Sequence, residues 1–344
     1  MNTSVISINE VEKAILDYQL DIAIETLSDL IEDDSDGRAM YLLALCCLYN
    51  ADIDDEKEEI IEELLERGYE LENPLAAIRY AKECSYEEED IYEEYMSQIK
   101  HMSENGDVFA EYEYGDLLIQ SKRDIEEGVA WLKESSKSGF WLATIQLGQC
   151  YEDGIGVETN GKKAFRCYKQ AYRRGVPMAM ELLGDCYYYG MGTEENEEKA
   201  CEIYSEYVSV YLNNIEDDFG DDEDDIFDSL SQLAENLNKI PNMKYLGYNL
   251  GMCLLSEDDS GFLSSGYFKA AADLKNPFAC YELAKIYYLM DYDEDSDSFS
   301  GLWLEDASDY LDKASKYSSE YDDDALQLGI AELYTNLTEA MLLV

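Results

Sequence analysis

Apolar and small residues recur at helical spacing along most of the chain, with polar residues between them. Ala143, Leu147 and Tyr151 are four residues apart and therefore share one face of a helix. A glycine-containing turn follows, and a second stretch then places Ala164 and Tyr168 on one face. This pattern predicts two helices joined by a short turn, and the alternation typical of strands is almost absent.

The same helix pair occurs again 36 positions later, where residues 179–211 align with residues 143–175. The identical positions include Ala143/Ala179, Leu147/Leu183, Gly148/Gly184, Cys150/Cys186, Tyr151/Tyr187, Gly154/Gly190, Gly156/Gly192, Lys163/Lys199, Ala164/Ala200 and Tyr168/Tyr204. A fixed period in the mid-thirties is typical of stacked helix pairs rather than of one globular core. Gly148 has no side chain, so it allows the second helix to approach the first closely.

The matched segments carry A-x-x-x-L-G-x-x-Y-x-x-G-x-G, followed by K-A-x-x-x-Y, within residues 143–204. This arrangement resembles the Sel1-like repeat, a helix-turn-helix relative of the tetratricopeptide repeat. Weaker copies lack the G-x-G turn but keep a Leu-Gly pair or a variant of it: Leu43-Ala44, Tyr80-Ala81, Tyr114-Gly115, Leu250-Gly251, Leu283-Ala284 and Leu328-Gly329. The resemblance implies an all-α, right-handed α-solenoid of about eight Sel1/TPR-like helix pairs with terminal capping helices.

The spacing of these pairs predicts how the chain is organised. An interval of 67 positions separates Gly184 from Gly251, about two periods, so we expect a degenerate copy between them. The predicted segments are N-terminal capping helices at 1–34, Sel1-like repeats at 35–213 with the best copies at 143–211, an acidic degenerate repeat at 214–242, repeats with an acidic insertion at 243–320, and a C-terminal capping helix at 321–344. Three prolines are expected at the first positions of first helices, where proline is tolerated: Pro74, Pro177 and Pro277.

Acidic residues outnumber basic ones by 78 to 25, which gives a formal net charge of −53. Such a field repels nucleic-acid phosphates and anionic membranes, so we expect neither as a partner. It attracts basic proteins or cations. Two explanations of the charge stay open: it keeps the protein soluble, or it steers a basic partner toward the chain.

One segment has the opposite charge. Residues 162–174 carry six of the 25 basic residues, namely Lys162, Lys163, Arg166, Lys169, Arg173 and Arg174. Four of them follow the spacing i, i+4, i+7 and i+11, which places them on one helical face. This face is either a docking surface for an acidic partner or a second copy, or it is compensated within the chain by Glu194, Glu195, Glu197 and Glu198.

Residues that catalysis or metal binding would need are scarce. The single histidine, His101, has no recognisable nucleophile beside it, and zinc-type Cys/His spacing is absent. The acidic loop that begins at Asp291 alternates carboxylates as calcium loops do, but Ser296 and Leu302 replace the required Gly and Glu. The sequence therefore predicts no catalytic residue, no metal site and no cofactor, and so no enzyme.

Cysteine usage and hydropathy bear on the cellular location. The chain has nine cysteines, no basic and apolar leader at its start, and no run of 18 apolar residues. We expect free thiols, a cytoplasmic protein and no membrane span. The alternative is a disulfide Cys150–Cys167 or Cys186–Cys201, because some secreted proteins with this repeat are bridged within repeats.

The resemblance implies that first helices line a concave binding surface, and that the protein is a scaffold or adaptor for other proteins. The candidate contact residues, placed by their register to the Leu-Gly pair, are Phe109, Tyr112, Asp116, Gln149, Glu152, Asp185, Tyr188, Tyr245, Tyr248, Tyr281 and Tyr288. We expect one or more basic protein partners. The alternative function is an immunity-type or DNA-mimic inhibitor that neutralises a basic nucleic-acid-binding protein or toxin.

Overall fold

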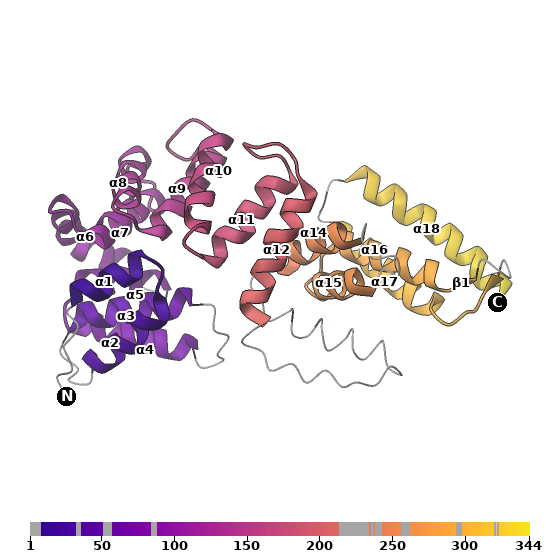
Figure 1. The fold of residues 1–344 in the computed structure, drawn as a ribbon, viewed down its shortest axis with the longest axis horizontal. Coiled ribbons are helices and arrows are strands. Elements are labelled where there is room, and N and C mark those ends of the chain that lie inside the picture. Colours follow the sequence, from indigo (N-terminus) through magenta and orange to yellow (C-terminus); the bar gives the residue numbers. More distant parts are fainter. Residues whose placement is uncertain are drawn as a thin grey trace. The chain divides into compact units, whose positions relative to one another are not determined.

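The computed structural model describes residues 8–31, 36–50, 57–83, 88–212, 234, 237, 243–255, 262–293, 298–319, 321 and 323–344. The chain forms two compact units, Met1–Glu195 and Asn196–Val344, each of which is described by itself (Figure 1). Both are built almost entirely from helices, in agreement with the all-α solenoid that the repeat predicts. The predicted degenerate copy at 214–242 lies almost wholly outside the described residues.

The first unit is a stack of helices in chain order. They are α1 (Ile8–Leu16), α2 (Leu20–Leu30), α3 (Gly37–Tyr49), α4 (Lys57–Glu70), α5 (Pro74–Glu83), α6 (Glu88–Glu104), α7 (Val108–Gln120), α8 (Ile125–Lys137), α9 (Trp141–Asp153), α10 (Gly161–Tyr172) and α11 (Pro177–Tyr188). Each helix packs on the next, and α5 also contacts the first helices α3 and α7 on either side. This is the arrangement expected of stacked helix pairs.

The second unit continues the pattern with one interruption. It contains α12 (Glu197–Leu212), α14 (Met243–Leu255), α15 (Phe262–Asp273), α16 (Pro277–Met290), β1 (Tyr292–Asp293), β2 (Ser298–Phe299), α17 (Leu304–Ser318) and α18 (Asp324–Leu343). The two short strands pair antiparallel within the acidic insertion, with Tyr292 opposite Phe299. The sequence did not predict this hairpin, because two-residue strands leave no alternating pattern.

Helix boundaries follow local chemistry. Pro74, Pro177 and Pro277 each occupy the first position of a helix, as the sequence predicts. Asp107 caps α7, since its carboxylate accepts the backbone N–H groups of residues 109 and 110 at 3.1 Å. Gly154 ends α9 in the left-handed conformation with φ 75°, which a residue with a side chain adopts at a cost.

The glycine of the Leu-Gly pair marks where two helices of a repeat meet. A Cβ atom on Gly148 would lie 2.5 Å from the ring of Tyr168 on α10. In the second unit, a Cβ on Gly251 would lie 2.6 Å from the ring of Phe268 on α15. Glycine at this position therefore lets an aromatic side chain of the second helix pack directly on the first-helix backbone.

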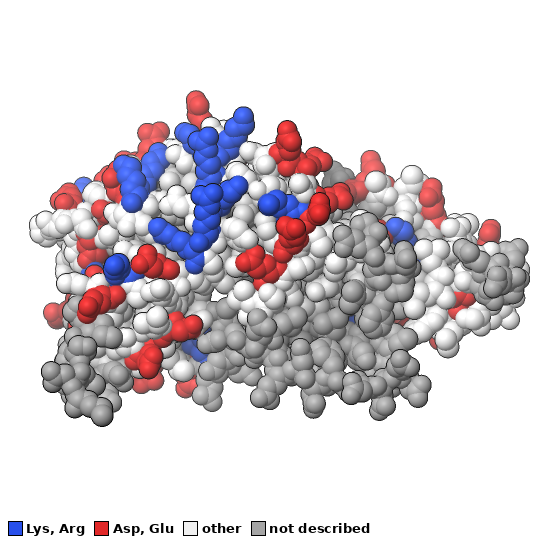
Figure 2. Space-filling view, in the orientation of Figure 1, with Lys and Arg blue, Asp and Glu red and all other residues white. Residues whose placement is uncertain are grey.

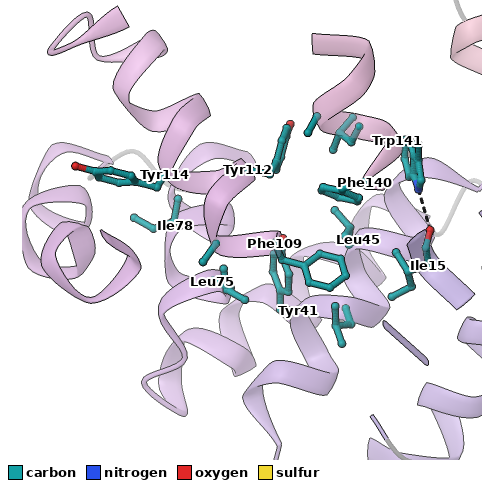
Figure 3. Close-up of a cluster of buried hydrophobic side chains, with 14 of the residues drawn as sticks. Ile15, Tyr41, Leu45, Leu75, Ile78, Phe109, Tyr112, Tyr114, Phe140 and Trp141 are labelled. Carbon is teal, nitrogen blue, oxygen red and sulfur yellow. Dashed lines mark hydrogen bonds between the residues drawn. The ribbon is translucent and has the colours of Figure 1, made fainter. Parts of the chain in front are cut away.

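Aromatic side chains fill the core of the first unit (Figure 3). The Phe140 ring lies 5.1 Å from Phe109 and 5.7 Å from Trp141 between ring centroids. The indole N–H of Trp141, which is 1 % exposed, donates to the carbonyl of Ile15 at 3.0 Å. This bond ties α1 to α9 across 126 positions of sequence.

Asp291 joins the start of the acidic insertion to the residues that precede α17. Its buried carboxylate accepts the backbone N–H groups of Gly301 at 3.0 Å, Leu302 at 2.9 Å and Trp303 at 3.2 Å, and also bonds the Ser300 hydroxyl. These donors use the oxygens that a calcium ion would need at the first position of a calcium loop. The carboxylate thus closes the loop before α17 begins.

Candidate protein-binding groove

A groove with a volume of about 280 Å³ lies where three first helices of the first unit meet. Its lining residues are Ile119 at the end of α7, Gln146, Gln149, Cys150, Glu152 and Asp153 on α9, Ile155 in the following turn, and Leu182 on α11. The groove therefore combines an aliphatic lining with carboxylate and amide groups. All of its helices belong to consecutive repeats.

The spacing of α9 residues forms one wall of the groove. Gln146, Gln149, Cys150 and Asp153 follow i, i+3, i+4 and i+7, so they lie on one helical face. The opposite side of α9 packs on α10 through Gly148. Because α9 is held closely from behind, this wall is preformed rather than assembled on binding.

A buried polar network positions Gln146 at the base of the groove. The carboxylate of Asp116, 2 % exposed, accepts from Lys82 Nζ at 2.6 Å, from Gln120 Nε2 at 2.9 Å and from Gln146 Nε2. Because its amide nitrogen faces Asp116, Gln146 turns its carbonyl oxygen Oε1 the other way. That oxygen is buried and has no hydrogen-bond partner. It is a buried acceptor without a donor, which costs stability in the fold.

Carboxylates give the groove its charge. Glu152 is half-buried, and one of its oxygens accepts the hydroxyl of Tyr168 at 2.6 Å. Burial, then the hydrogen bond and charge of Glu152, raises the pKa of Tyr168. Within the described residues, neither Glu152 nor Asp153 forms an ion pair with a Lys or Arg. Their negative charge is therefore open to a partner.

Three of the predicted contact residues lie inside the protein and correct the sequence-based placement. Phe109, Tyr112 and Asp116 are 2 %, 3 % and 2 % exposed. Phe109 packs on Tyr41 and Tyr112 packs on Phe140, with ring centroids 6.4 Å and 5.3 Å apart. These side chains fill the space between neighbouring first helices, so they are not available as surface contacts.

The other predicted residues reach the surface at different places. Gln149 and Glu152 line the groove, with Gln149 exposed, while Asp185 and Tyr188 are half-buried on α11. In the second unit Tyr245 is exposed, and Tyr248, Tyr281 and Tyr288 are half-buried. Tyr281 packs against Gly329 of α18, and Tyr288 packs on Phe299 with ring centroids 5.2 Å apart.

Sequence reasoning missed most of the aliphatic part of the groove. Ile119, Ile155 and Leu182 lie outside the register that selected the candidates. Gln146 and Asp153 could have been found, because they lie three residues before and four residues after Gln149 on the same helical face. Extending the helical register in both directions from Gln149 predicts both residues.

The thiol of Cys150, which lines the groove, has low reactivity. Burial, followed by the charges of Asp116 and Asp153, raises the pKa of Cys150 to about 11, so the thiol is protonated at neutral pH and is a poor nucleophile. Eight cysteines of the described residues are free thiols: Cys46, Cys47, Cys150, Cys167, Cys186, Cys201, Cys253 and Cys280.

His101 is exposed, and the described residues contain no group of His, Cys, Asp and Glu that could hold a metal ion. None of the helices described is long and apolar enough to cross a membrane.

The repeats match a known family. The Sel1 repeat matches residues 108–140, 141–176 and 177–206, which are the pairs α7/α8, α9/α10 and α11/α12. These include every helix that lines the groove. No curated protein matches the sequence.

Similar solved structures include a Sel1 repeat protein from Oxalobacter formigenes, at 18 % identity over 71 % of this chain and 85 % of that one, with a TM-score of 0.48. The protective antigen c5321 of uropathogenic Escherichia coli, which has an SLR fold, is 15 % identical over 92 % of this chain and 71 % of that one, with a TM-score of 0.45. The P58(IPK) TPR domain is 12 % identical over 96 % of this chain and 97 % of that one, with a TM-score of 0.23. Residues 108–206 thus match three consecutive copies of the Sel1 repeat.

Proposed function

We propose that this protein is a non-enzymatic scaffold that binds other proteins through the groove between α7, α9 and α11. Sel1 repeats generally mediate contacts between proteins. The observation that carries the proposal is the combination of unpaired carboxylates on Glu152 and Asp153 with the aliphatic side chains of Ile119 and Leu182. A scaffold of this kind needs a preformed surface and no reacting group.

The chemistry of the groove favours a Lys or Arg side chain of the partner. The aliphatic stem of such a side chain packs on apolar walls while its charged end contacts carboxylates. The net charge of −53 steers basic proteins toward the chain from a distance. The free thiols accord with a cytoplasmic location, where thiols stay reduced.

A peptide array tests the proposal. We expect the purified full chain to retain peptides that carry Lys or Arg next to an apolar residue. The variant Gln149→Arg/Asp153→Arg should lower that affinity about tenfold or more, because it places two positive charges where the partner's cation binds. Both residues are exposed, so the substitutions should leave the fold intact.

The matched control is Gln98→Arg/Glu66→Arg, which makes the same change of charge at exposed positions on α6 and α4. We expect less than a twofold change in affinity for the control. Equal losses in both variants would show that net charge alone drives binding. Enrichment of acidic peptides, or retention unaffected by the groove variant, would refute the proposed groove.

The inhibitor alternative is favoured by the same net charge but predicts a different outcome. An inhibitor that mimics phosphate charge forms one stoichiometric complex with a single strongly basic protein. A scaffold binds several partners with modest affinity. Capturing partners from the protein's own cell lysate at near-physiological and several-fold higher salt separates the two, since only the dedicated complex should persist at high salt.

A further inference from the structure

A second surface, distinct from the groove, lies on α10. Lys162, Arg166 and Arg173 are exposed and Lys169 is half-buried on one face of this helix. Figure 2 shows Lys and Arg side chains gathered over α8 to α10, with acidic side chains at the edges of the cluster. We refer to Lys162, Arg166, Lys169 and Arg173 as the basic face. None of the residues that line the groove belongs to α10.

The basic face has no carboxylate partner among the described residues, including Glu194 and Glu195 of the same unit. Most cations elsewhere in this unit do have a carboxylate partner. The paired ones include Arg38 with Glu12, Arg67 with Glu70, Arg79 with Glu113, Lys82 with Asp116, Lys100 with Glu127, Arg123 with Glu93 and Lys137 with Glu134. In a chain of net charge −53, this concentration of unpaired cations is a local exception. The structure therefore shows no direct ion pair that would compensate these charges within the described residues of the unit.

The helix beneath the basic face is firmly held. Its N-terminus is capped by Asn160, whose side chain accepts from the backbone N–H of Lys163 at 3.1 Å. Tyr168 is fully buried against Gly148. At the other end, the guanidinium of Arg174 donates to the carbonyl of Gly139 and, at 3.3 Å, to that of Leu16. A rigid support means that a ligand would not have to order the helix on binding.

The positive surface continues beyond α10, because two lysines lie beside one tyrosine ring. The Nζ of Lys163 lies 4.7 Å from the centroid of the Tyr151 ring, and the Nζ of Lys133 on α8 lies 5.9 Å from the same centroid. Both ammonium groups are held near the ring by cation–π attraction. The positive surface therefore runs from α10 toward α8.

Four like charges on one helical face destabilise a helix unless something offsets them. Along the axis the basic face spans about 16 Å, which follows from eleven residues at ~1.5 Å each. A membrane or a nucleic acid is much larger than this and would also meet the repulsive field of the remaining surface. A second copy of the chain would bring its own large negative charge. A short acidic segment is small enough to contact the basic face and no other part of the surface.

We infer that the basic face binds an acidic helical segment of a partner protein. Such a helix, with carboxylates at i, i+4, i+7 and i+11, repeats the axial spacing of Lys162, Arg166, Lys169 and Arg173. The scaffold would then hold two kinds of protein at once, a basic one in the groove and an acidic one on α10. This inference does not depend on the proposed function of the groove.

The test uses the full chain and a labelled helical peptide of about 15 residues with Glu at the spacing i, i+4, i+7 and i+11. Fluorescence anisotropy at low salt should show binding that weakens as salt is added. The variant Lys162→Gln/Arg166→Gln/Lys169→Gln/Arg173→Gln should lose roughly tenfold or more in affinity, since each charge pair contributes a small amount. Circular dichroism checks that the variant is folded.

The matched control neutralises four other cations of the same unit, each of which already has a carboxylate beside it: the exposed Arg67, Arg123 and Lys137 and the half-buried Lys100. We expect this control to bind the peptide within twofold of the parent. Equal binding by the parent and the basic-face variant would overturn the inference. So would tighter binding of duplex DNA or phosphatidylserine vesicles than of the peptide, or self-association that depends on the basic face. A groove variant should leave peptide binding unchanged.

Discussion

Replacing Glu113 with alanine should destabilise the unit of residues 1–195 by about 3 kcal/mol, because it leaves the buried guanidinium of Arg79 with only the partly exposed Glu83, at 3.1 Å, as a counter-charge. Arg79 and Glu113 are each 1 % exposed. Glu113 Oε1 accepts from Arg79 Nη2 at 2.5 Å, from Arg79 Nε at 3.0 Å and from the Tyr41 hydroxyl at 2.8 Å. Burial is the largest single influence on the pKa of Arg79 and would lower it, but the charge of Glu113 together with the smaller contributions of Tyr49, Tyr112 and Tyr41 raises it overall. Arg79 therefore stays charged.

Urea unfolding, monitored through amide hydrogen exchange in α7, measures the change in the free energy of unfolding of the first unit. The control is Arg67→Ala, which breaks the exposed Arg67–Glu70 pair and should change stability by less than about 0.5 kcal/mol. The triple variant Tyr41→Phe/Arg79→Met/Glu113→Leu should recover most of the stability, since it replaces the whole network with apolar groups. A loss below about 1 kcal/mol in Glu113→Ala would mean that water reaches the pair.

Replacing Gly192 with alanine is expected to cost about 1–3 kcal/mol more than the same change at Gly175. Both glycines have positive φ, 72° and 77°, so alanine is strained to a similar extent at each. They differ in their surroundings. A Cβ on Gly192 would collide with the backbone carbonyl of Gly161 at the start of α10, whereas a Cβ on Gly175 has no atom within 4 Å.

Thermal unfolding of the two variants beside the parent gives the difference directly. Because the φ strain is common to both, the extra loss in Gly192→Ala reports the contact between the turn after α11 and the start of α10. That contact is what the second glycine of the G-x-G turn provides between neighbouring repeats. Equal losses would show that the glycine is needed for its backbone conformation alone.

The repeat could be predicted because its positions carry information that does not depend on the partner. Gly148 needs to be small for Tyr168 to pack, and Gly154 needs a left-handed backbone. Such requirements recur at a constant period, so one sequence reveals them. The same reasoning placed Pro74, Pro177 and Pro277 at helix starts.

The candidate site was harder to predict because burial depends on which helices are neighbours. Phe109 and Tyr112 have the register of groove residues, yet α3, α5 and the segment before α9 cover them. The pairing of Arg79 with Glu113 joins residues 34 positions apart, a distance at which charge alone gives no partner. Asp291 was assigned to an acidic loop, whereas three backbone N–H groups and a hydroxyl surround its carboxylate.

The central claim is that a partner protein binds in the groove between α7, α9 and α11, and site-specific photo-crosslinking tests it most directly. A photoreactive phenylalanine analogue at Gln149, which lines the groove, is compared in the protein's own cells with the same analogue at exposed Gln98 on α6. We predict a covalent adduct with a Lys- or Arg-bearing segment of another protein from position 149 and none from position 98. Adducts of equal yield at both positions, or none at position 149, would contradict the account.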